Sequence, residues 1–407
     1  MHKVKIGIPF NENYAPNAGG GFSYTTQLLK AIDDYQFNDE IEIVFLDFTG
    51  KTKLTFNQSL LSFHPFKNAG FSDFIRKTIL LVLRKLGFRP FKHLINRIEH
   101  LHAGARDQYI VKNLRSNNIA LLFYANPDGN TFNYPFITTH WDIGHESTYM
   151  FPEFAESLKS RQNYYNHVIV KALAILTETE TGKKELIRYT NLNKDRISVM
   201  PMFPGNIINQ HVEQSEQHLI LQQYGLNKNE FFIYPAQFWA HKNHITLIDA
   251  FKLLLSKRPN LKLVLTGSDK GNLEYIKFYL NNNNLKGDVK MLGFVSNAEL
   301  YTFYKNAIAL TMPTFLGPSN MPPLEAANLG CPVLLSDLEG HRELMGDYPT
   351  YFDPLNAEDL AEKMWLQVNA ISEQKPFPHQ TKFSTASAME ALEKTFLKVL
   401  KIRKNWA

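Results

Sequence analysis

The sequence predicts an α/β protein built from two Rossmann-like, doubly wound domains. Short apolar segments of strand length alternate with helical patterns along most of the 407 residues, which is typical of parallel sheets joined by helices. A chain of this length has room for two ordinary domains. The alternation is interrupted by a polar stretch, punctuated by Pro and Gly, at 201–216. We therefore expect a first domain over 1–200, a linker over 201–216, a second domain over 217–383 and a final helix over 384–407.

The composition is that of a globular protein, and it narrows the classes of partner. Apolar residues make up 44% of the chain and charged residues 20%, which is typical of a folded protein. The formal net charge of +5 favours anionic partners such as a nucleoside diphosphate. The charge is too small to demand a nucleic acid, so we expect no nucleic acid as partner.

Cysteine usage and the lack of long apolar runs predict a cytoplasmic location. Cys331 is the single cysteine, so no internal disulfide can form, which fits a reducing compartment. The first residues run directly into a strand pattern, without the apolar core of a cleavable signal. No apolar run approaches the ~20 residues that are needed to cross a bilayer.

The first predicted strand is followed by a glycine-rich loop that could hold a ligand. Val4–Pro9 has the apolar pattern of a buried strand, and Phe22–Asp33 has the pattern of a helix. Between them, Gly20 and Gly21 would let the backbone approach a ligand closely at the helix N-terminus. A flexible strand-to-helix turn would have the same glycines without any ligand. Ile41–Leu46 is the second predicted strand.

Residues 71–100 depart from the alternation because they are both apolar and strongly basic. Seven Lys or Arg residues stand against two acids in this segment, and Gly87 and Pro90 are expected to divide it into two helices. Basic amphipathic helices can lie on an anionic membrane surface. The alternative is a pair of core-facing helices with a solvated basic side. A peripheral position on the inner face of the cell membrane is therefore one of two options.

A segment with two histidines follows one of the remaining strands of the first half. His140 and His145 flank Asp142 after the predicted strand Pro135–Thr139. An imidazole can donate to a sugar hydroxyl or, when protonated, to a phosphate. Either histidine could fill this role, although a lone histidine in a loop is more often structural. The other elements expected in this half are Ile119–Tyr124, Ala172–Thr177, the helix Thr181–Tyr189, and Ile197–Met200.

The second half has a regular strand–helix alternation, and its most informative stretch is Met312–Asp337. A loop rich in Gly, Pro, Ser and Asn leads into a short helix, which a pair of prolines begins and Gly330 ends. Open α/β sheets bind anionic ligands in such loops, at the carboxyl ends of strands. Glu325 lies near the start of that helix, where it could also merely complement the helix dipole. Strands are expected to begin near Phe231, Leu261, Val289, Ala307, Val333 and Thr350.

The Met312–Asp337 stretch resembles the donor-site signature of the retaining glycosyltransferases of family 4. That family has the GT-B fold, in which two Rossmann-like domains face a central cleft. Its signature has two glutamates eight positions apart, and the second typically holds the ribose hydroxyls of a nucleotide sugar. Glu325 matches the second glutamate, whereas Gly317 stands in place of the first. The resemblance implies a donor-binding loop that comprises Gly317, Ser319, Asn320, Met321, Pro322, Leu324 and Glu325.

A second resemblance concerns the loop after the strand that begins near Phe231. The family commonly has an arginine there and, five residues on, a lysine, and both hold the donor diphosphate. Lys242 matches the lysine, but Gln237 stands where the arginine is common. The histidine segment, with Phe151-Pro152-Glu153 after it, resembles the family's cleft segment. The resemblance implies a catalytic set of His140, His145, Asp142 and Lys242, and further donor contacts at Gly20, Gly21, Gln237, Gly267, Phe294 and Val295.

The resemblance implies a sugar transferase that uses a nucleotide-sugar donor. The new bond would keep the anomeric configuration of the donor. Neither a metal ion nor another cofactor is expected, since Lys242 and helix dipoles can replace a cation. The acceptor would be a glycan or a lipid-linked saccharide in cell-surface polysaccharide synthesis, of the O-antigen or capsule kind. Two alternatives stay open: a non-catalytic partner subunit that keeps the fold, and a nucleotide-sugar epimerase on the same architecture.

Overall fold

Parallel strands joined by helices build both units of the chain, which confirms the predicted α/β class. The first unit comprises residues 1–13, 33–138 and 166–173, and the second comprises residues 14–32, 139–165 and 174–407. The computed structural model describes residues 3–10, 20–64, 66, 81, 89–127, 132–370, 377–378 and 381–403, without the side chains of 89–100.

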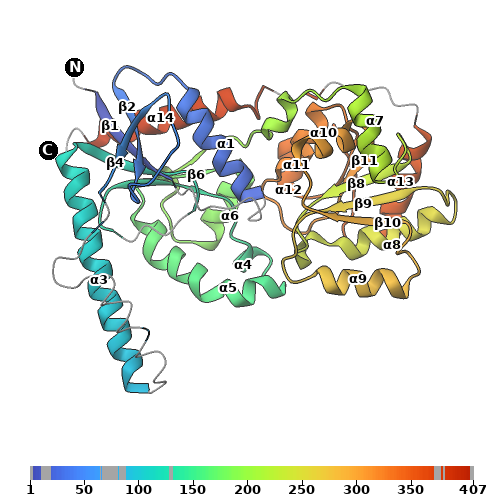
Figure 1. Ribbon diagram of the computed structural model, residues 1–407, viewed down its shortest axis with the longest axis horizontal. Helices are drawn as coiled ribbons and strands as arrows, with labels where there is room; N and C mark the ends of the chain where they lie inside the picture. Colours follow the sequence, from blue (N-terminus) through green and yellow to red (C-terminus); the bar gives the residue numbers. More distant parts are fainter. Residues whose placement is uncertain are drawn as a thin grey trace. The chain divides into compact units, whose positions relative to one another are not determined.

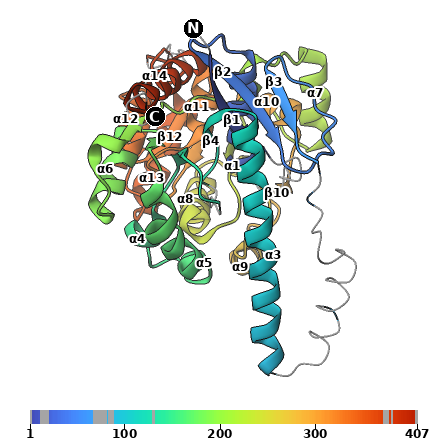
Figure 2. The same ribbon diagram turned by 90° about the vertical axis from the view of Figure 1, so that its left-hand side faces the viewer.

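The strands of the first unit lie in the order β3-β2-β1-β4-β5, and neighbouring strands are parallel. Figure 2 shows β1, β2 and β3 side by side. β1 and β4 have the predicted bounds because both are short, mainly apolar segments with a buried centre. β3 was not predicted, since it is short, mostly exposed and serine-bounded. The bounds are β1 (Val4–Pro9), β2 (Ile41–Asp47), β3 (Ser59–Ser62), β4 (Ile119–Tyr124) and β5 (Phe136–His140).

A long helix, α3 (Arg89–Ser116), begins within the basic segment 71–100 of the first unit. Pro90 is its second residue, where the missing backbone N–H breaks no helical hydrogen bond. The C-terminal part of α3 packs on β4, with Ile110 and Leu114 buried. Its N-terminal part extends away from the strands of this unit (Figures 1 and 2). Leu81 is also helical, but the rest of the predicted helix pair before residue 89 lies outside the described residues.

The main sheet of the second unit is six-stranded and parallel, in the order β10-β9-β8-β11-β12-β13. Its strands begin at or close to the positions that the sequence predicts. Helices α8 and α9 lie on one face of this sheet, and α10 and α11 lie on the other (Figure 1). The strands are β8 (Phe231–Pro235), β9 (Lys262–Thr266), β10 (Val289–Gly293), β11 (Ala309–Met312), β12 (Val333–Ser336) and β13 (Thr350–Phe352). The four helices are α8 (His244–Leu255), α9 (Leu273–Asn282), α10 (Asn297–Asn306) and α11 (Met321–Asn328).

The last helix, α14, has the apolar stripe that the sequence predicts, with Ala388, Leu392 and Phe396 fully buried. Lys398 Nζ donates to the backbone oxygen of Asp195, at 2.9 Å, just before β7. β7 pairs with β6 in parallel. The other elements that lie wholly or mostly in this unit are α1 (Gly20–Asp34), α4 (Gly144–Ser147), α5 (Pro152–Asn163), β6 (Ala174–Thr177), α6 (Glu180–Tyr189), β7 (Ile197–Val199), α7 (Gln214–Gln223), α12 (Glu339–Met345), α13 (Ala357–Asn369) and α14 (Thr385–Arg403).

The order of the strands reverses direction at β8 and thereby creates a ligand-binding position. The chain moves from β8 outward to β9 and β10, then returns to place β11 on the other side of β8. The loops after β8 and β11 therefore leave in opposite directions, which opens a crevice at the carboxyl ends of these two strands. Lys242 follows β8, and residues 313–320 follow β11, so both predicted donor loops begin at this crevice.

One asparagine joins three segments beneath that crevice. Asn243 has a left-handed backbone with φ 57°, which connects the turn Ala240–Lys242 to α8. Its buried Nδ2 donates to the backbone oxygens of Pro313, at 3.0 Å, and Pro354, at 2.8 Å. Asparagine tolerates this backbone region better than other residues that have a Cβ. The loops after β8, β11 and β13 are thus held together by one side chain.

Replacing Asn243 should lower the free energy of unfolding for two separable reasons, lost hydrogen bonds and backbone strain. Asn243→Gly keeps the backbone freedom but leaves two buried carbonyl oxygens without this donor, which should cost roughly 1–3 kcal/mol. Asn243→Ala should cost about 1 kcal/mol more, because a Cβ strains the left-handed backbone. Chemical denaturation of the three proteins measures both differences. Equal stability of the glycine variant and the native protein would show that the two hydrogen bonds contribute nothing.

Candidate functional site

The loops at the carboxyl ends of β8–β11, together with residues of α1 and α5, line a cavity of about 900 Å³. Among the residues that the structure describes, those that line it all belong to the second unit. Most residues predicted from the sequence as site residues line this cavity. His140, His145 and Leu324 are not among its described lining residues. The predicted residues that do line it are Gly20, Gly21, Asp142, Gln237, Lys242, Gly267, Phe294, Val295, Gly317, Ser319, Asn320, Met321, Pro322 and Glu325.

The two predicted histidines pack around Tyr165. The ring of His140 is buried and its Nε2 lies 2.8 Å from Tyr165 Oη, whose own proton goes to the backbone oxygen of Asp142. Burial lowers the pKa of His140 to about 4, so this imidazole is neutral at physiological pH. The ring of His145 is also buried and lies against the Tyr165 ring, with centroids 5.0 Å apart. The shared tyrosine comes from a distant helix end that the sequence pattern did not indicate.

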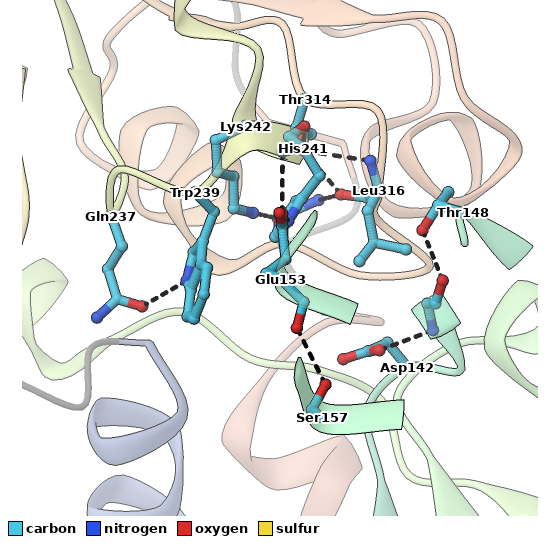
Figure 3. A network of polar contacts seen from close by, with 12 residues as sticks. Asp142, Thr148, Glu153, Ser157, Gln237, Trp239, His241, Lys242, Thr314 and Leu316 are labelled. Carbon is cyan, nitrogen blue, oxygen red and sulfur yellow. Dashed lines mark hydrogen bonds and ion pairs between the residues drawn. The ribbon is translucent and has the colours of Figure 1, made fainter. Parts of the chain in front are cut away.

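Asp142 lines the cavity and is held by a cation. Its Oδ1 accepts from Arg161 Nη1, at 3.0 Å. It also accepts from the backbone N–H of Gly144, at 2.9 Å (Figure 3). Burial by itself would raise the pKa of this carboxyl, but the charge of Arg161 and the hydrogen bond from Gly144 bring the pKa below its ordinary value. Asp142 is therefore an ionised, paired carboxylate.

Lys242 presents an ammonium group to the cavity from the turn after β8. Its Nζ donates to Asn320 Oδ1 at 3.1 Å, in the loop that precedes α11. Burial lowers the pKa of Lys242 to about 8, although the carboxylates of Asp142 and Glu153 raise it. The cation is thus only partly stabilised by its surroundings. A bound anion at this position would supply the missing stabilisation.

Gln237 occupies the place where a second cation is common in the resembling family. Its Nε2 donates to Ser268 Oγ, at 2.9 Å. Its Oε1 accepts from Trp239 Nε1, at 3.2 Å (Figure 3). These two contacts fix the orientation of the amide. Gln237 therefore contributes a neutral group to the cavity wall.

Glu325 is held at the base of the cavity by donors from two other segments. Tyr304 Oη donates to its Oε2 at 3.2 Å, and the backbone N–H of Gly205 also donates to the carboxylate. Burial raises the pKa of Glu325 to about 7 despite these donors. A Cβ at Gly205 would lie 2.1 Å from Glu325 Oε1, so only glycine allows this close approach.

The start of α11 offers fewer backbone donors than its position suggests. The helix begins at Met321, and its second and third residues are the prolines Pro322 and Pro323, which have no N–H. Asn320, at the N-cap, forms no side-chain capping bond. Within the first helical turn, Met321 thus retains a backbone N–H that can face an anion. The charge of Lys242 is correspondingly more important for any phosphate at this site.

His241, Glu153 and Glu178 also line the cavity and were not assigned a role from the sequence. His241 Nδ1 donates to Glu153 Oε1 at 2.5 Å, and the backbone N–H of His241 donates to the same oxygen at 3.1 Å (Figure 3). Glu178 accepts a hydrogen bond from Ser319 Oγ, and burial raises the pKa of Glu178 to about 8. Glu178 directly follows β6. Its position at the end of a strand is the feature of the sequence that could have indicated a site residue.

Part of the chain matches a known protein family. Residues 216–380 match the family model described as Glycosyl transferases group 1. O-antigen chain mannosyltransferase B of Escherichia coli is 24% identical over 230 residues, which cover 55% of this chain and 59% of that protein. O-antigen chain mannosyltransferase RfbU of Salmonella typhimurium is 28% identical over 205 residues, which cover 50% of this chain and 51% of that protein. The chain thus spans little more than half the length of these relatives.

Solved structures resemble the chain over nearly its whole length. A glycosyltransferase from Rickettsia africae has a TM-score of 0.59 and 14% identity, covering 100% of this chain and 97% of that one. HepE from Anabaena, solved in complex with UDP-glucose, has a TM-score of 0.58 and 16% identity, covering 98% and 97%. At such identities the likeness concerns the fold, and it confirms the predicted GT-B fold. Residues 216–380 are therefore of the glycosyl transferases group 1 type, within a chain that has the fold of solved glycosyltransferases.

Proposed function

We propose that the protein transfers a sugar from a nucleotide-sugar donor to a glycan or a lipid-linked saccharide, with retention of the anomeric configuration and without a metal ion. The observation that carries this proposal is that Lys242 and Glu325 line the same cavity, where the strand order reverses. The names of the two relatives favour an acceptor in surface polysaccharide synthesis, of the O-antigen kind.

The cavity has suitable groups for each part of a nucleotide sugar. Lys242 would bind the diphosphate, and Glu325 would accept hydrogen bonds from the ribose hydroxyls. The base would lie between the loops after β8, β9 and β10. Gly267, with φ 141°, brings the loops after β8 and β9 together there, because a Cβ at this position would lie 2.3 Å from the backbone oxygen of Ala236. Only glycine allows these two loops to approach so closely.

The proposed chemistry needs charge stabilisation more than acid–base groups. As the bond from the sugar to the diphosphate breaks, negative charge grows on the departing oxygen, and Lys242 stabilises that charge more in the transition state than in the ground state. In same-face attack, the acceptor oxygen forms the new bond while its proton passes to the departing phosphate. Asp142 is paired with Arg161 and so is not required as a base.

The proposed function is tested by offering a panel of nucleotide sugars. The correct donor should raise the melting temperature, since it binds the native state. That donor should then be consumed in the presence of a saccharide acceptor and a metal chelator, and NMR of the product reports its anomeric configuration. Binding without any turnover would instead identify a non-catalytic partner subunit. Conversion of the sugar without transfer would identify an epimerase.

Association with an anionic membrane surface through residues 71–100 remains a prediction. Among the residues that the structure describes, no helix is both long and apolar enough to cross a membrane. The basic segment would bring the enzyme to a lipid-linked acceptor, and such attraction is weakened by salt. Binding to vesicles of anionic and of neutral lipid, at low and high salt, tests this part of the proposal.

Glu325→Gln should weaken nucleoside binding by roughly 1.5–3 kcal/mol, because a charged acceptor of ribose hydroxyls becomes a neutral one. Binding to native protein should strengthen as pH rises through about 7, where Glu325 becomes ionised. The variant should show no such pH dependence. Isothermal titration calorimetry with the nucleoside alone measures both effects and leaves out the charge of Lys242. Tyr304→Phe keeps the carboxyl group but removes a donor that lowers its pKa, so the pH dependence should move to higher pH in this variant. An affinity that the glutamine variant fully retains would remove Glu325 from the site.

Lys242→Ala should reduce the affinity for a nucleoside diphosphate by about tenfold or more and leave nucleoside affinity nearly unchanged. The reason is that a charge-assisted hydrogen bond to phosphate is lost. Turnover should fall further than diphosphate affinity, since charge on the diphosphate grows in the transition state. Titrations with both ligands and single-turnover rates provide the comparison. Equal losses for nucleoside and diphosphate would contradict a phosphate role.

A further inference from the structure

A chain of hydrogen bonds, buried at His341, runs from β12 to the ammonium of Lys242. His341 Nδ1 lies 2.7 Å from the backbone oxygen of Ser336, and His341 Nε2 lies 2.9 Å from Asn320 Nδ2. Asn320 Oδ1 accepts from Lys242 Nζ at 3.1 Å. The side chain of His341 is fully buried, and Asn320 is 7% exposed. The four groups therefore form one relay that ends at the cavity.

The chemistry of these groups gives the relay a single direction. The Ser336 oxygen can only accept, so His341 Nδ1 must carry the proton. His341 Nε2 is then the acceptor of a hydrogen bond from the Asn320 amide nitrogen. This orientation turns Asn320 Oδ1 toward Lys242, where a cation needs an acceptor. A protonated His341 would break the relay, and burial lowers its pKa to about 4.

Gly317 leaves the space that the relay occupies. A Cβ at residue 317 would lie 2.0 Å from Asn320 Nδ2 and 3.0 Å from His341 Nε2. Any side chain there would displace the asparagine from the histidine. The backbone of residue 317 is thus packed against the junction of the relay, and glycine is the residue that this arrangement requires.

We propose that Asn320 and His341 are positioning residues that hold the Lys242 ammonium toward the donor diphosphate, and that Gly317 is required because it admits this relay. The proposal rests on the proposed function, since it assigns Lys242 to the diphosphate. It adds that His341, acting through Asn320 in the loop after β11, determines the direction of the Lys242 ammonium. Neither positioning residue needs to touch the donor for this role.

Two substitutions of His341 separate its hydrogen bond with Asn320 from its hydrogen bond with Ser336. Glutamine can place its amide oxygen near the position of Nε2 and so can still accept a hydrogen bond from Asn320. Asparagine can place a donor near the position of Nδ1 and so keeps only the bond to Ser336. Both variants lose one hydrogen bond of the same kind. If His341 served only the stability of the fold, the two variants would behave alike.

The experiment measures the ratio of affinities for a nucleoside diphosphate and its nucleoside by calorimetry. UDP, GDP, ADP and CDP, with their nucleosides, are tried on native protein, and the base that binds most tightly is used. His341→Asn should lower the ratio by about tenfold, the scale of a charge-assisted hydrogen bond. His341→Gln should retain most of the ratio. Gly317→Ala should lower it as His341→Asn does, and adding His341→Asn to Lys242→Ala should cause no further loss.

The outcomes distinguish this proposal from the proposed function. Native protein that binds no nucleoside diphosphate would overturn both. Native binding with the same ratio in all His341 variants would overturn the relay and leave the role of Lys242 intact. Equal losses in the glutamine and asparagine variants would also overturn it, because they would reflect stability alone. Melting temperatures of every variant show whether each is folded under the conditions of the titrations.

Discussion

The structure of the site depends on keeping one ammonium ion away from bulk water. A cation that loses its hydration is costly unless oxygen atoms or opposite charges replace the lost water. Lys242 receives one amide oxygen, from Asn320, and the longer-range influence of Asp142 and Glu153. This support is incomplete, which leaves the cation available for an anion. The left-handed Asn243, the strand-order reversal and the loop after β11 all serve to hold this group in place.

Four of the carboxyl groups that line the cavity fall into two pairs with opposite protonation behaviour. Asp142 and Glu153 each have a strong donor, from Arg161 and His241, and their pKa values lie below the ordinary range. Burial dominates at Glu178 and Glu325, and raises their pKa values. The first pair therefore provides fixed negative charge. The second pair can change protonation near neutral pH, so it responds to what occupies the cavity.

The sequence predicted most of the fold because most of its strands are short, mainly apolar segments with clear ends. β1 and β4 match the predicted bounds, whereas the exposed β3 has no such pattern. Lys242 and Glu325 could be placed on one cavity because the strand ends of a parallel sheet converge. The surroundings of His140 could not be predicted, since Tyr165 reaches it from a distant segment. For the same reason, the relay through His341 is invisible in the sequence: it depends on a contact between residues 21 positions apart.

The raised pKa of Glu325 has a consequence for the heat of binding. Near pH 7 this carboxyl is partly protonated in the free protein. Hydroxyl groups that donate to it favour the ionised form, so their arrival would expel a fraction of a proton into the buffer. The measured enthalpy of nucleotide binding would then contain the ionisation enthalpy of whichever buffer takes up that proton. The same ligand would release different heats in phosphate and in Tris, although its contacts with the protein are identical.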